Sequence, residues 1–250
     1  MLFSGGRHRL SISKPVSGTR RAIDILAAAV VVVGAFGLSS PAVAADCGSS
    51  PVSGIDWSEC NKKNLILKGS SFDQANLAGI DFTMTDLSDT DLSSANLEKA
   101  TLVRAWMTNA AAKKANFAKI EAYRSGFSGI VADGATFSNA ELQRANFTGA
   151  KLTGVNFEKA ELGRANFDKA VLTGTRFSFA NLSRARLSGA TFEGPIAFDS
   201  AFMYRTHIEG VDLSAATGLL QAQVDLACGD PSTKLPADLT VPAGWPCGTD

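Results

Sequence analysis

Histidine is almost absent from this 250-residue sequence, which contains only His8 and His207. No nucleophile or cluster of metal-ligating residues is spaced around His207, and the sequence has neither a G-x-S-x-G motif nor a glycine-rich phosphate loop. We therefore expect no enzymatic activity, no bound metal and no cofactor. We interpret His207 as a structural residue at an inward position near the end of a repeated region.

Long apolar runs are also lacking. The longest, residues 25–38, has 14 residues, whereas a membrane-spanning helix needs about 20. It follows a segment, residues 1–21, with five basic residues and no acidic ones, and it precedes the small-residue triplet Ala42-Val43-Ala44. This order is typical of a secretory signal peptide with an A-x-A cleavage site. We predict removal of residues 1–44 and a periplasmic or secreted protein, the alternative being an uncleaved inner-membrane anchor.

The sequence has no excess of charge of either sign, with 24 basic and 24 acidic residues. Without residues 1–44 the balance is 19 basic to 23 acidic residues. No broad basic face is expected from these numbers, so nucleic acid is not favoured as a partner.

What the sequence does contain is a repeat of five residues. Every fifth position from Phe72 to Phe202 gives 27 sites, of which 22 are leucine or phenylalanine. Two residues before each lies a second constrained site, which is alanine in 16 of 27 cases and never charged or aromatic. A period of five fits neither an amphipathic helix nor a strand. The chain must therefore turn once in every repeat, with one large and one small side chain pointing inward.

Residues 145–149 (ANFTG) and 165–169 (ANFDK) show the unit most clearly. The pattern resembles the pentapeptide-repeat family, with its motif A-(N/D)-(L/F)-x-x, over about residues 70–202. The resemblance implies an all-β fold: a right-handed quadrilateral parallel β-helix with four repeats in each coil. We divide the chain into a signal peptide (1–44), an N-terminal cap (45–64), the solenoid (65–213) and a C-terminal cap and tail (214–250). In the last part we expect a short helix over about 219–227 that Gly229 terminates, following a register slip at 211–213.

With four repeats in each coil, the inward side chains form columns. One column contains Met107, Phe127, Phe147, Phe167 and Leu187, and another contains Phe117, Phe137, Phe157 and Phe177. We predict stacked phenylalanine rings in both, at the spacing of neighbouring strands, about 4.8 Å. Alanine stands at three inward sites, Ala112, Ala122 and Ala132. We expect a slimmer or distorted coil there, filled by Met107 or Val131.

The four cysteines, Cys47, Cys60, Cys228 and Cys247, flank the repeats in pairs. About seven coils between the ends would separate the two pairs by roughly 30 Å, beyond the reach of a disulfide. We therefore predict Cys47–Cys60 and Cys228–Cys247 bonds that clamp the two caps, whose role is to cover the open edges of the solenoid.

One outward column is basic. Arg104, Arg124, Arg144, Arg164 and Arg184 recur once in every four repeats and should line one edge of the solenoid. Neutralisation by Glu121, Glu141 and Glu161, or simple duplication of repeats, would account for this column. The functional interpretation is a surface for an anionic ligand or partner, because guanidinium groups suit carboxylates and phosphates. The outward aromatic residues Trp106 and Tyr123 could contribute to the same surface.

The sequence thus favours an exported, non-catalytic scaffold that binds an unknown protein or envelope partner. The family resemblance also implies an alternative, a DNA mimic that binds a topoisomerase, as in quinolone-resistance proteins. Residues 65–213, with 16 basic and 16 acidic residues, lack the acidic excess that such mimicry requires. A membrane-anchored envelope protein is the third interpretation.

Overall fold

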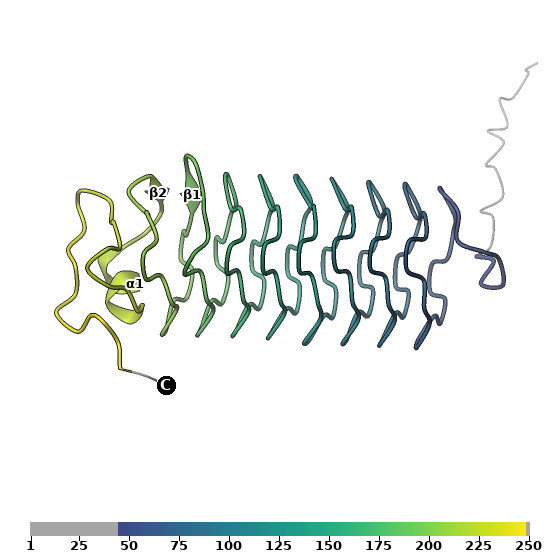
Figure 1. The fold of residues 1–250 in the computed structure, drawn as a ribbon, viewed down its shortest axis with the longest axis horizontal. Coiled ribbons are helices and arrows are strands. Elements are labelled where there is room, and N and C mark those ends of the chain that lie inside the picture. The colour runs from purple at the N-terminus through teal and green to yellow at the C-terminus, as the bar shows by residue number, and fades with distance from the viewer. Residues whose placement is uncertain (1–44, 249–250) are drawn as a thin grey trace, which may run out of the picture. The chain divides into compact units, whose positions relative to one another are not determined.

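The computed structural model describes residues 45–248. The predicted signal peptide, with His8 and its cleavage site, lies outside the described residues. Within 45–248, no helix combines the length and the apolar character needed to cross a membrane. The described chain winds into a stack of coils with a capped end on either side (Figure 1).

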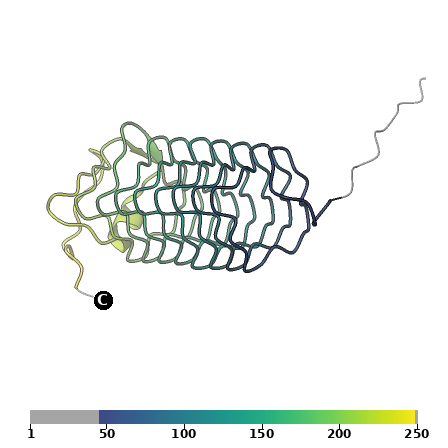
Figure 2. The same ribbon diagram turned by 45° about the vertical axis from the view of Figure 1, so that its right-hand side comes forward.

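Parallel bridges between successive coils hold the stack together. They start at Asp56↔Asn76, recur once in every repeat, and join each residue to its equivalent four repeats later as far as Val171↔Thr191. Four bridges in each coil give four sides, seen as parallel rows of backbone in Figure 2. The prediction of a solenoid of five-residue repeats is confirmed, whereas its handedness stays a prediction. The ladder begins at Asp56, inside the segment assigned to the N-terminal cap.

The core consists of the large and small side chains that alternate along the repeat. The two predicted phenylalanine columns are confirmed: the ring centroids of Phe127 and Phe147 lie 4.7 Å apart, and those of Phe137 and Phe157 lie 5.1 Å apart. The columns belong to opposite sides of the coil, and their rings meet edge to face, as Phe137 and Phe147 do at 5.8 Å. Leucine occupies most inward sites of the other two sides.

The coil around Ala112, Ala122 and Ala132 is regular, so the expected distortion is wrong. The backbone nitrogens of these residues donate to Val131, Glu141 and Lys151 of the next coil at 2.7, 2.8 and 2.9 Å. Val131 lies on the outside and fills no space in the core. Because phenylalanine rings reach across the interior from two opposite sides, leucine-sized side chains on the other sides are not needed to keep the ladder intact.

The register slips earlier than predicted. Val171 still pairs with Thr191, its equivalent four repeats later, but Arg176 pairs with Ala197, one position beyond its equivalent. One extra residue therefore lies in 192–196, where the ladder includes β1 (Ile196–Ala197), which pairs in parallel with β2 (Ala216–Thr217). Beyond this point every inward position moves by one.

The C-terminal end is closed by a short helix and a tail. Helix α1 (Gln221–Leu226) lies inside the predicted range, and the buried Gln223 side chain donates to the carbonyls of Phe198 and Ala201 at 2.8 and 2.9 Å. Gly229 does not terminate the helix, because Ala227 is the C-cap residue. Gly229 instead makes room for the indole ring of Trp245, which would overlap with any β-carbon there. Cys228 and Lys234 extend the ladder into the predicted tail.

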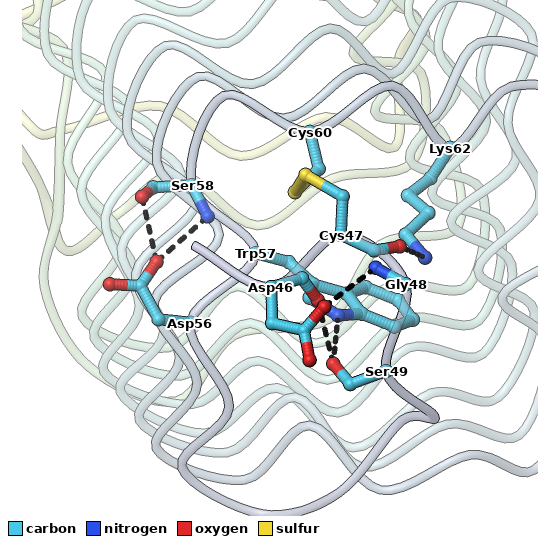
Figure 3. The surroundings of a disulfide bond; sticks show 9 residues. All are labelled: Asp46, Cys47, Gly48, Ser49, Asp56, Trp57, Ser58, Cys60 and Lys62. Carbon is cyan, nitrogen blue, oxygen red and sulfur yellow. Dashed lines mark hydrogen bonds between the residues drawn. A yellow bond between two sulfur atoms is a disulfide. The ribbon is translucent and has the colours of Figure 1, made fainter. Parts of the chain in front are cut away.

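Each cap contains one disulfide. Cys47 and Cys60 have Cα atoms 5.6 Å apart, and Cys228 and Cys247 have theirs 5.4 Å apart. At the N-terminal end the bond lies beside the buried Trp57, whose indole nitrogen donates to Ser49 and whose ring is covered by the ammonium group of Lys62 at 3.6 Å (Figure 3). Both bonds join residues within one end of the solenoid.

Candidate interaction surface

The five predicted arginines occupy equivalent turn positions in successive coils. Arg104, Arg124, Arg144, Arg164 and Arg184 all have left-handed backbone conformations, with φ between 57° and 62°. Their side chains project outward from one corner, and coils stack at about 4.8 Å. The first four are exposed and Arg184 is half-buried. We call these five residues the arginine column.

The arginine column makes no ion pair within the described chain. The expected partners Glu121, Glu141 and Glu161 approach none of these guanidinium groups within 4.0 Å, and Glu161 instead accepts a hydrogen bond from Asn181 at 2.9 Å. Cations elsewhere do pair, as the following contacts show: Lys63–Asp81, Lys119–Glu98 and Lys234–Asp212, each at 2.8 Å. Like charges about 5 Å apart repel by about 1 kcal/mol in water, so the column weakens the fold unless a bound anion compensates it.

A groove of about 430 Å³ lies along part of the arginine column. Its lining residues are Gln143, Arg144, Gly163, Arg164, Ser183, Arg184 and Tyr204. A second outward column runs beside the arginine column. In it the large residues Tyr123 and Gln143 are followed by the small residues Gly163 and Ser183, which leave space for the groove, and then by Tyr204 at the end of the groove. Gly163 has no positive φ, so its lack of a side chain opens the groove without serving the backbone.

Arg184, one of the residues that line the groove, also carries an unsatisfied donor. Its Nε atom is buried and has no hydrogen-bond partner among the described residues. A buried donor without a partner costs about 1–3 kcal/mol.

Two residues of this surface were missed from the sequence. Tyr204 and Arg205 occupy the turn positions that follow Ser183 and Arg184, as the bond from the Arg184 nitrogen to the Tyr204 carbonyl at 2.9 Å shows. Arg205 shares the left-handed conformation, with φ of 51°. A search at a fixed period of four repeats misses them. The extra residue in 192–196 moves each of them one position later in the sequence than that period predicts.

The aromatic residues proposed for the surface lie outside the groove. Trp106 is half-exposed on the side of the solenoid that follows the arginine corner. Tyr123 lies beside Arg124, whose guanidinium carbon is 5.1 Å from the ring centroid. Neither residue lines the groove, which begins at Gln143.

His207 does not point into the core, so its predicted inward position is wrong. The slip places Ile208 there instead, and the imidazole Nδ1 of His207 contacts the Glu209 carboxylate at 2.8 Å. Burial alone would raise the pKa of Glu209, but hydrogen bonds from Ser188 and His207 hold that pKa below its ordinary value. The Ser188 hydroxyl donates to Glu209 at 2.6 Å rather than to the imidazole.

The ladder and its inward columns define a solenoid built from five-residue units. Two family models match this part of the chain, pentapeptide repeats in eight copies over residues 70–109 and a pentapeptide repeat region over residues 100–177. Residues 70–177 therefore consist of pentapeptide repeats, as the motif predicted. No curated protein matches it.

Solved structures of pentapeptide-repeat proteins resemble the chain at low identity. HetL, a protein involved in heterocyst differentiation regulation from the cyanobacterium Nostoc, is 23% identical over 79% of this chain and 94% of its own, with a TM-score of 0.46. QnrB1, a plasmid-mediated fluoroquinolone resistance protein, is 19% identical over 71% of this chain and 91% of its own, with a TM-score of 0.47. A protein of the Arabidopsis thaliana thylakoid lumen is 24% identical over 37% and 68%, with a TM-score of 0.32.

Proposed function

We propose that the chain is an exported, non-catalytic scaffold whose solenoid binds a partner protein through the arginine column. The observation that carries this proposal is the lack of any ion pair along the column within residues 45–248, where other surface cations do pair. Repulsion between stacked guanidinium groups weakens the folded state, so an anionic partner is the simplest physical reason to keep the column.

Export to the periplasm or beyond the cell is the second part of the proposal. The signal-peptide pattern of residues 1–44 supports it, and so does the use of all four cysteines in disulfides, which persist in oxidising compartments. A disulfide at each end also suits a solenoid outside the cell, since the two caps protect the open edges of the ladder.

Capture by crosslinking tests the scaffold function. Wild-type protein crosslinked in the envelope fraction should recover a partner that is lost when all five arginines of the column are changed to glutamine. The variant should fold normally, because exposed charges contribute at most about 1 kcal/mol each. Recovery of the same proteins at the same yield with both forms would remove the arginine column from the proposal.

The mature N-terminus tests export. Mass spectrometry of the protein recovered from the periplasm or medium should find a chain that begins at Ala45 or Asp46. The physical reason is that the apolar run of residues 25–38 is long enough for a signal-peptide core but too short to span a bilayer. Intact chains that begin at Met1 in the membrane fraction would instead support the anchored form.

A further inference from the structure

We propose that the groove along Arg144, Arg164 and Arg184 binds a short acidic segment of the partner protein, with its carboxylates on the guanidinium groups and an apolar side chain at the Tyr204 end. This assignment rests on the proposed function and specifies the chemistry of its partner. The occupant is a single extended peptide segment, for reasons of length, width and surface character.

The length of the groove suits three or four residues. Arg144 and Arg184 are two coils apart, which at about 4.8 Å for each coil is about 10 Å. An extended peptide rises about 3.3 Å per residue, so three consecutive residues span this distance. The volume of about 430 Å³ is compatible with the few side chains that such a segment would place in the groove.

The width of the positive surface excludes a broad polyanion. Glu141 and Glu161 precede Arg144 and Arg164 in the same repeats, and both carboxylates are exposed on the adjoining side of the solenoid. A nucleic-acid duplex laid over the arginines would meet these carboxylates and be repelled. An extended peptide is narrow enough to contact the arginines alone.

The aromatic end of the groove suits an apolar side chain. Phe202 and Tyr204 are half-exposed, and their rings are nearly parallel with centroids 6.4 Å apart. Exposed aromatic pairs of this kind act as anchors at protein interfaces. An acidic segment that continues into a leucine or similar residue would bury that side chain against Tyr204.

The arginines of the groove are available to such a ligand. No hydrogen bond or ion pair from the side chains of Arg144, Arg164 or Arg184 to another side chain or to the backbone occurs within the described residues. An incoming carboxylate accepts two parallel hydrogen bonds from a guanidinium group. Binding would therefore satisfy donors that the folded chain leaves unused.

Fluorescence anisotropy with a dye-labelled peptide of three glutamates and one leucine tests the proposal on the purified protein. Changing Arg144, Arg164 and Arg184 to glutamine should weaken binding about tenfold, because three screened contacts together amount to one power of ten in affinity. The matched control changes Lys151, Lys169 and Arg186 to glutamine, three exposed cations outside both the arginine column and the groove. It removes the same charge and should leave affinity within about twofold. Equal losses in both triple variants would overturn the proposal.

A second variant tests the hollow itself without changing charge. A β-carbon at Gly163 would lie 3.8 Å from the Ser183 carbonyl and 3.9 Å from Gln143, so Gly163→Gln fits the fold and fills the groove. It should weaken peptide binding about tenfold at an unchanged unfolding temperature, as expected when a larger side chain occupies a binding pocket. Wild-type affinity in this variant would contradict binding in the groove.

Other occupants give distinct results. Tighter binding of a single-stranded oligonucleotide of equal charge would overturn the choice of an acidic peptide. So would self-association in sedimentation experiments that the groove variant abolishes, since a second copy of the chain would then be the occupant. If crosslinking still recovers an arginine-dependent partner while the peptide fails to bind, the groove assignment is wrong and the scaffold function stands.

Discussion

Phe147→Asp is expected to destabilise the protein by more than about 5 kcal/mol, whereas Thr148→Asp should cost about 1 kcal/mol. Phe147 is fully buried, and its ring lies 4.7 Å from Phe127 and 5.0 Å from Phe167 in the same column. Removing such a ring costs about 3–5 kcal/mol, and a carboxylate left in its place has no hydrogen-bond partner in an apolar interior. Thr148 points outward, where its hydroxyl donates to Asn146.

Thermal and urea unfolding of the two variants measures this difference. Because both substitutions introduce the same charge at adjacent positions, Thr148→Asp controls for the effect of net charge. The expected result is a Phe147→Asp protein that is largely unfolded and a Thr148→Asp protein close to wild type. Similar losses in the two variants would mean that the inward and outward positions of the repeat are assigned wrongly.

The inward columns could be predicted from the sequence because the repeat determines them directly. With four repeats in each coil, as the family resemblance implies, residues four repeats apart lie above one another, so Phe127 and Phe147 were expected to stack. The alanine coil shows the limit of this reasoning. The small side chains of Ala112 and Ala132 led us to expect a distorted coil. The rings of Phe117 and Phe137 instead occupy the interior of this part of the solenoid, and the hydrogen bonds of the ladder involve only the backbone.

The register slip could not be located from the sequence because apolar residues hide it. Phe192 and Phe202 both match the period that began at Phe72, although Phe202 is half-exposed in the structure. The inserted residue lies in 192–196, and the neighbouring residues Phe198 and Met203 take over the inward positions. Two apolar residues side by side give the same sequence pattern in either register.

The candidate site could be predicted only in part from the sequence. The arginine column follows from a strict period of four repeats, so Arg144 and Arg164 were found. The groove depends on something else: the sizes of side chains in the neighbouring column, small at Gly163 and Ser183, and the slip that brings Tyr204 to its end. The closeness in sequence of Glu141 to Arg144 and of Glu161 to Arg164 led us to expect ion pairs. In the structure each glutamate lies on a flat side and each arginine at the following turn, and the two side chains do not pair.

Because of the register slip, Met203→Asp should lower the free energy of unfolding by about 3–5 kcal/mol, whereas Phe202→Asp should lower it by less than about 1 kcal/mol. The continued five-residue period predicts the opposite order, since it places Phe202 inside and Met203 outside. In the structure Met203 is fully buried, and Phe202 has 51% of its surface exposed. An aspartate at 203 would therefore bury a carboxylate beneath the C-terminal cap, where Gln223 of α1 holds the preceding turn.

Urea unfolding monitored by circular dichroism distinguishes the two registers, and limited proteolysis reports on the cap separately. Met203→Asp should release α1 and the tail to protease at lower urea concentrations than the rest of the solenoid, because each coil contacts only its neighbours and damage at one end stays local. Phe202→Asp serves as the control, with the same added charge one residue away on the outer surface. If Phe202→Asp proved the more damaging change, the extra residue would have to lie beyond 203, and Tyr204 could not close the groove.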